Sequence, residues 1–169
     1  MKLLFTGASG FLGSNLYSLL KDKYQIRTVG LTPRDNYTIN LVSDVPKLNI
    51  KYDVVLHAAG KAHSIPKTEE EKQLFFDVNL QGTKNLCTAL ENSGIPKAFI
   101  FISTVAVYGC DSGENITEEH PLNGTTPYAL SKICLLYTSY SEEISNAIYL
   151  SFSAASYFCK GYINEKHKV

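Results

Sequence analysis

The feature that most constrains the fold is a set of three glycines near the start of the chain. Gly7, Gly10 and Gly13 follow a short apolar segment, Leu3–Thr6, and leucines recur at helical spacing after them. A strand, a glycine turn and a helix together form the context that binds a dinucleotide pyrophosphate. The first glycine allows a sharp turn, the second allows close approach of the phosphates, and the third allows helix and strand to pack closely.

The spacing of these glycines is Gly-x-x-Gly-x-x-Gly, which differs from the Gly-x-Gly-x-x-Gly of the plain Rossmann signature. A glycine-rich turn that binds no ligand is therefore an alternative interpretation of the same residues. The other motifs of the chain must decide between the two.

Apolar segments of strand length alternate with segments of helical periodicity over the first 135 residues or so, which predicts an α/β fold with a parallel sheet. The predicted strands are Leu3–Thr6, Gln25–Leu31, Asp53–Gly60 and Ala98–Thr104. Helices are predicted after Gly13, over Gln73–Asn92 and from Pro127 onward. Lys61–Glu71 is predicted to be a loop with a helix start, and Asp111–Asn123 a surface loop.

Composition excludes several classes of partner. The chain has 169 residues, enough for one domain, and a formal net charge of zero, so it offers no nucleic-acid or anionic-membrane surface. No apolar run reaches the length of a membrane span or of a signal peptide. The cysteines are scattered, which favours reduced thiols in the cytoplasm and no metal site; they are Cys87, Cys110, Cys134 and Cys159.

The end of the second predicted strand bears on the choice of cofactor. An NAD-binding unit often places an acidic residue there, but Gly30–Thr32 contains none. Arg34 lies close by in the sequence and could face the 2′-phosphate of NADP, or it could be a solvated loop charge. NAD and NADP both stay open at this point.

The strand that begins at Asp53 ends in the small residues Ala58, Ala59 and Gly60, which would let a ligand lie against the backbone. His57 precedes them. It is either a catalytic group or a hydrogen-bonded structural histidine, and the second interpretation is the more common one for such a residue.

Tyr128 and Lys132 are four residues apart, so on a helix they share one face. A tyrosine is a poor base at neutral pH, but a lysine cation nearby favours the phenolate and lowers the tyrosine pKa. A positioned phenolate can then accept a proton from a substrate hydroxyl. An ordinary amphipathic pair on a helix surface is the alternative.

Taken together, these motifs resemble the extended short-chain dehydrogenase/reductase family, and within it the nucleotide-sugar epimerases and dehydratases. The resemblance covers residues 1 to 133. It is carried in order by the glycine motif, His57–Gly60, Asn79–Thr83, Ser103–Gly109 and Tyr128-x-x-x-Lys132. It implies a Rossmann-like doubly wound sheet, NAD or NADP as cofactor, a nucleotide-sugar substrate and a homodimeric parent enzyme.

The resemblance also assigns roles. Tyr128 would be the catalytic base, Lys132 would bind the nicotinamide ribose, and Thr104 would be the catalytic hydroxyl, with Ser103 the less favoured candidate. Asn40 stands where the family usually has an acidic residue, which is a departure. The cofactor-binding residues would be Gly7, Ser9, Gly10, Phe11, Leu12, Gly13, Arg34, Asn40, Leu41, His57, Ala58, Ala59, Gly60, Asn79, Ser103, Tyr128 and Lys132. Asn79 would act structurally, close to the active site.

The resemblance ends near Ile133, and residues 134–169 are predicted to be an atypical tail with no helix–strand alternation. The hexapeptide Cys134–Ser139 is what TGT CTC TTA TAC ACA TCT encodes, a sequence resembling the transposon end used to fragment DNA for sequencing. Our hypothesis is that the native reading frame ends near Ile133 and that residues 140–169 are chimeric. A natural truncation or a divergent tail is the alternative. In each case most of the sugar-nucleotide pocket is expected to be missing, so the chain would turn over little or no substrate.

A nucleotide-sugar reductase is the nearest alternative activity. A non-catalytic dinucleotide-binding module is an alternative from another class, and the Thr104, Tyr128 and Lys132 set argues against it because a sensor needs no base.

Overall fold

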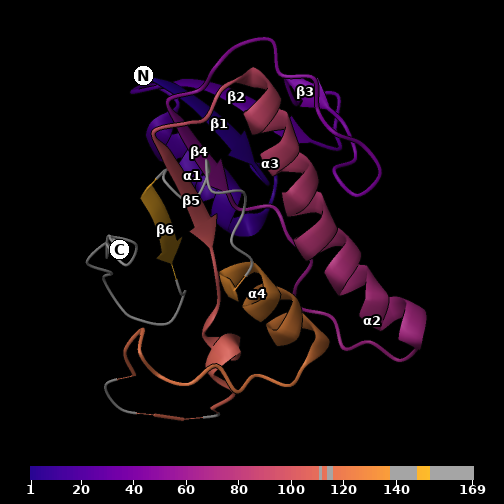
Figure 1. The fold of residues 1–169 in the computed structure, drawn as a ribbon. Coiled ribbons are helices and arrows are strands. Elements are labelled where there is room, and N and C mark those ends of the chain that lie inside the picture. Colours follow the sequence, from indigo (N-terminus) through magenta and orange to yellow (C-terminus); the bar gives the residue numbers. More distant parts are fainter. Residues whose placement is uncertain (111, 114–115, 138–147, 153–169) are drawn as a thin grey trace.

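The computed structural model describes residues 1–110, 112–113, 116–137 and 148–152, which form a six-stranded parallel sheet with helices packed on it (Figure 1). The strand order is β3-β2-β1-β4-β5-β6. This is the order of a Rossmann-like doubly wound sheet, so the predicted fold class is confirmed. The strands are β1 Lys2–Thr6, β2 Gln25–Gly30, β3 Tyr37–Thr38, β4 Val54–His57, β5 Ala98–Ile102 and β6 Ile148–Phe152.

Alternating side chains of the strands build a core on each face of this sheet. On one face, Leu3 and Phe5 of β1 pack with Leu16 and Leu20 of helix α1 (Phe11–Leu20). On the other face, the cluster comes mainly from the sheet, from helix α3 (Gly82–Ser93) and from helix α4 (Pro127–Tyr137). Its buried members are Leu4, Val29, Tyr52, Val55, Leu86, Cys87, Leu90, Phe99, Phe101 and Leu135.

The helix predicted over Gln73–Asn92 is longer and is not uniform. It comprises α2 (Glu69–Phe75), a π-helical segment η1 (Phe76–Gln81) and α3. Thr68 caps its start by accepting a hydrogen bond from the Glu71 backbone N–H at 3.3 Å. It ends where predicted, at Gly94, whose φ of 113° a residue with a side chain rarely adopts.

A short 3₁₀ helix, η2 (Val105–Tyr108), follows β5 and packs against α4 through Val107, Tyr108 and Ile133. Helix α4 opens at Pro127 as predicted and runs on to Tyr137. Strand β6 then pairs in parallel with β5. The sequence predicts no helix–strand alternation over residues 134–169, but residues 148–152 form a strand that extends the sheet. The rest of the predicted tail lies outside the described residues.

Candidate functional site: a glycine turn and a buried lysine at the carboxyl edge of the sheet

The glycine turn lies between β1 and α1, and two of its glycines are required by the protein's own packing. Gly7 has a φ of 77°, and a Cβ there would lie 2.5 Å from the Ala59 nitrogen. A Cβ on Gly13 would overlap the carbonyl group of Gly7. The turn is therefore held against the end of β4, where Ala58 and Ala59 leave room for it.

Gly10 differs from its two neighbours, because a Cβ there would meet only the Gly7 carbonyl oxygen, at an ordinary 3.4 Å. No contact among the described residues requires a glycine at this position, which is exposed and starts α1 without a side-chain cap. Ser9, Phe11 and Leu12 around it are also exposed, with Phe11 at 91%. This uncapped helix start suits a phosphate group.

His57, at the end of β4, is buried within a directed chain of hydrogen bonds. The Thr83 hydroxyl donates to the Asn79 carbonyl, so its oxygen must accept from His57 Nε2–H at 2.8 Å. His57 Nδ1 is then unprotonated and accepts from the Thr6 hydroxyl at 2.6 Å. Burial, together with the charge of Lys132, lowers the pKa of His57 to about 3. Both ring nitrogens are used, so this geometry matches the structural histidine of the two alternatives.

Asn79 lies in the π-helical segment η1 and connects two other parts of the site. Its side-chain nitrogen donates to the Ser131 hydroxyl at 2.9 Å, and its oxygen accepts from the Lys61 backbone N–H at 2.7 Å. The Ser131 hydroxyl in turn donates to the Tyr128 carbonyl at 2.7 Å. Asn79 thus connects the loop after β4 to α4, and its role beside an active site stays a prediction.

Lys132 is a buried cation, with 5% of its surface exposed. Its ammonium donates to the Ile102 carbonyl at 3.0 Å and lies 4.4 Å from the centre of the Phe101 ring. No carboxylate pairs with it in the described part of the chain. Burial lowers the pKa of Lys132 to about 8. A Cβ on Gly60 would lie 3.4 Å from this ammonium, so Lys132 sits where the ends of β4 and β5 meet.

The remaining predicted catalytic groups come from the elements that adjoin this lysine. Tyr128 is half-buried on α4, with its ring centre 6.1 Å from that of Phe75. Thr104 follows β5 and caps η2 by accepting from the Ala106 N–H at 3.2 Å. The hydroxyl of Ser103 is buried, and the described residues give it no partner. A buried polar atom of this kind suggests a ligand contact.

Three other predicted cofactor-binding residues follow β2, one before β3 and two after it. Arg34 is exposed and forms no ion pair with any described residue. Asn40 closes a turn by accepting from the Val42 N–H at 3.1 Å. Leu41 packs against the core, and its carbonyl accepts from the Asn85 side chain at 2.7 Å.

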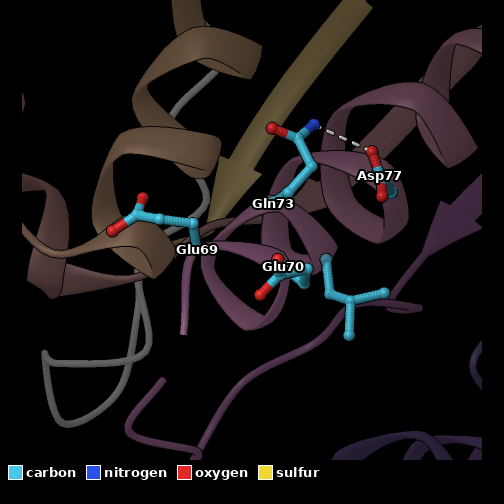
Figure 2. Close-up of a pocket in the computed structure, with 5 residues that line it drawn as sticks. Glu69, Glu70, Gln73 and Asp77 are labelled. Carbon is cyan, nitrogen blue, oxygen red and sulfur yellow. Dashed lines mark hydrogen bonds between the residues drawn. The ribbon is translucent and has the colours of Figure 1, made fainter. Parts of the chain in front are cut away.

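A separate surface hollow of about 610 Å³ lies along α2 (Figure 2). Its lining is acidic, and Gln73 donates to Asp77, one helical turn away, at 2.9 Å. Because carboxylates repel phosphates, this hollow does not suit a dinucleotide, and the glycine turn does. The residues that line it are Glu69, Glu70, Gln73, Leu74 and Asp77.

Comparison with known proteins agrees with this geometry. The sequence model of the NAD dependent epimerase/dehydratase family matches residues 3–153. The chain belongs to this family. An epimerase from Escherichia coli O157:H7, N-acetyl-alpha-D-glucosaminyl-diphospho-ditrans,octacis-undecaprenol 4-epimerase, is 34% identical over 77% of this chain and 40% of its own length. The UDP-glucose 4-epimerase of Mycoplasma genitalium is 31% identical over 87% of this chain and 48% of its own.

A solved structure of this family, the UDP-glucose 4-epimerase of Thermus thermophilus in complex with NAD, superposes with a TM-score of 0.70. It is 26% identical and is matched over 90% of this chain and 54% of its own. The chain thus spans about half the length of the epimerases that it matches. The predicted family is confirmed, but the match to the family model runs to residue 153, so the prediction that the resemblance ends near Ile133 is wrong.

The described residues also bear on metal sites, membrane-spanning helices and disulfides. They contain no group of three His, Cys, Asp or Glu side chains that could hold a metal ion. Across the same residues, no helix is both long and apolar enough to cross a membrane. Cys87, Cys110 and Cys134 form no disulfide within the described residues, and Cys159 lies outside them.

Proposed function

We propose that this chain is the cofactor-binding part of an NAD-dependent nucleotide-sugar epimerase or dehydratase of the cytoplasm. The observation that carries the proposal is Lys132, a buried cation that has spare N–H groups and no described counter-ion. An unpaired buried charge is costly, so it indicates a ligand that supplies hydrogen-bond acceptors. The ribose hydroxyls of a dinucleotide bound on the glycine turn are such acceptors.

The residues present fit NAD in three respects. Gly10 leaves space that the protein does not use, the start of α1 offers free N–H groups to the pyrophosphate, and the buried Ser103 hydroxyl lacks a partner among the described residues. The Thermus thermophilus UDP-glucose 4-epimerase was solved in complex with NAD, which supports NAD as the cofactor.

In the proposed reaction, NAD supplies the hydride chemistry at the sugar carbon when it is bound. The Tyr128 phenolate accepts the proton of the sugar hydroxyl, and the Thr104 hydroxyl donates a hydrogen bond to the same oxygen. Lys132 holds positive charge beside them. Tyr128 returns its proton to the same oxygen when the sugar is reduced again, so the protein ends each cycle unchanged.

Tyr128→Phe tests this assignment in a version of the chain that carries a restored C-terminal region. We expect NAD affinity, measured by calorimetry, to stay within about twofold, because the ring is kept. Epimerisation of a UDP-sugar should fall by at least a hundredfold, since general-base catalysis typically contributes 10²–10⁴-fold. Unchanged turnover would refute the catalytic role, and a reduced sugar product would favour the nucleotide-sugar reductase.

The chain as printed spans about half of its relatives' length, and we expect it to bind NAD but to turn over little or no UDP-sugar. Binding energy from remote parts of a substrate orients its reacting centre, and most of the residues that would supply it are expected to be missing. A robust rate from the purified chain would contradict this expectation. A homodimeric parent enzyme stays a prediction.

A further inference from the structure

The carboxyl end of β2 is the place where a Rossmann unit that binds NAD usually carries an acidic residue for the adenosine ribose. In this chain the last residue of β2 is Gly30, and the residue before it, Val29, pairs with Thr6 of β1. The strand therefore ends beside the glycine turn without an acid of its own.

A carboxylate from another position fills that place. A Cβ on Gly30 would lie 2.5 Å and 2.9 Å from the two carboxyl oxygens of Asp35, and 2.7 Å from the carbon between them. The Asp35 carboxylate thus occupies the space beside Gly30 that a side chain at residue 30 would need.

The turn between β2 and β3 holds this carboxylate in position. Asp35 Oδ2 accepts hydrogen bonds from the Thr32 backbone N–H at 3.1 Å and from the Thr32 hydroxyl at 2.7 Å. Asn36 ties the same turn to β2 through Thr28, with distances of 2.9 Å and 3.2 Å. Within the described residues, Oδ1 of Asp35 accepts no hydrogen bond, so it is available to an outside donor.

We propose that Asp35 binds the adenosine ribose hydroxyls and makes the site select NAD over NADP. The inference rests on the proposed function. A ribose offers two O–H donors to the carboxylate, whereas the 2′-phosphate of NADP brings negative charge against it. Arg34 is the neighbouring residue that would favour NADP, but the carboxylate, not the guanidinium, lies over Gly30.

Calorimetric titration of the chain with NAD and with NADP tests this inference. The wild type should prefer NAD by at least tenfold. Asp35→Asn keeps an oxygen for Thr32 but loses the charge, so NAD binding should weaken roughly tenfold to a hundredfold, as for a lost hydrogen bond to a charged group. NADP binding should weaken less or improve. Asp35→Glu retains the charge and should continue to reject NADP.

Asp22→Asn is the matched control, because it removes the same charge from an exposed residue at the opposite end of β2. It should leave both affinities unchanged. Equal affinity of the wild type for NAD and NADP would overturn the role of Asp35 alone, as would full discrimination in a folded Asp35→Asn variant. Binding of neither nucleotide would overturn the proposed function and this inference with it.

Discussion

At the scale of single residues, His57 has a protonation state fixed by its neighbours. Its chain of hydrogen bonds requires a neutral ring protonated on Nε2, and its pKa lies at about 3. Nitrogen NMR of the ring should show this tautomer from pH 8 down to pH 4.5 while the chain stays folded. His57→Gln identifies the signal by removing it. An imidazolium spectrum at pH 6 would contradict the chain of hydrogen bonds.

The same pKa has a consequence for stability. The unfolded histidine binds a proton near pH 6.5, whereas the folded one does so only near pH 3. The free energy of unfolding therefore decreases as the pH falls from 6.5 towards 3. Between pH 7 and pH 5 this one residue should remove about 2 kcal/mol. Urea unfolding of the wild type should therefore be more acid-sensitive than that of His57→Gln.

Lys132 is expected to lower the stability of the fold while it supports cofactor binding. Its folded pKa of about 8 lies below the ordinary 10.5, so at pH 7 the buried charge opposes folding, and stability rises as the pH passes from 8 to 10.5. Lys132→Met should raise the free energy of unfolding at pH 7 by about 1–2 kcal/mol, after loss of the Ile102 hydrogen bond and the Phe101 ring contact. The same variant should weaken NAD binding.

Urea unfolding without cofactor, at pH 7 and at pH 10, measures the first effect of Lys132→Met, and the gain should shrink at the higher pH. Lys84→Met is the control, because Lys84 is exposed on α3. A variant that is less stable than the wild type at pH 7 would show that the hydrogen bond outweighs the buried charge.

At the scale of elements, two glycines of one turn should respond differently to the same substitution. Gly13→Ala places a methyl group on the Gly7 carbonyl, so the unfolding midpoint should drop sharply. Gly10→Ala meets only an ordinary contact, so the fold and midpoint should be kept while NAD affinity falls. Circular dichroism and calorimetry separate the two. Full NAD affinity in Gly10→Ala would mean that no phosphate approaches this turn.

The π-helical segment η1 depends on a hydroxyl from the next turn. Thr83→Val leaves the Asn79 carbonyl and the His57 Nε2–H without their partner, which should lower the free energy of unfolding by about 1–3 kcal/mol. Thr88→Val removes a similar hydroxyl-to-carbonyl bond, to Lys84 at 3.2 Å, from the exposed side of α3. It should change stability by less than about 0.5 kcal/mol. Equal effects would show that the buried network adds nothing.

At the scale of the whole molecule, the sheet and its glycine turn could be predicted because short-range patterns carry them. Apolar runs of strand length and the Gly7 motif are local signals. The start of α2 could also have been predicted, because Thr68-x-x-Glu71 is a capping-box pattern. The sequence analysis did not use this signal. The two residues of β3 are too few to form a pattern.

The parts of the site that the sequence analysis missed arise from contacts between distant residues. The hydroxyls of Thr6 and Thr83 meet across the His57 ring, although 77 positions separate them. Asp35 is close in sequence to Gly30, yet only the turn shows that its carboxylate lies over that glycine. No periodicity or spacing encodes either contact.

The origin of residues 134–169 is a question about the whole chain. We expect the source genome, amplified across the codons for Ser131 to Tyr140 and sequenced without a transposon, to depart from the printed sequence after Ile133. A genomic frame that encodes Cys134 to Val169 as printed would refute the chimeric hypothesis. It would also strengthen the interpretation of the chain as a non-catalytic binding module.

β1 is a central strand of the sheet and also the first to be synthesised, so the parts of the candidate site form around it in a fixed order. β1 is synthesised first and pairs on one side with β2 and on the other with β4, so the sheet grows outward in both directions from the oldest residues of the chain. The glycine turn and Asp35 therefore emerge early. Lys132 emerges nearly a hundred residues later, and until then a nascent chain holds the glycine turn without the lysine that we propose binds the nicotinamide ribose.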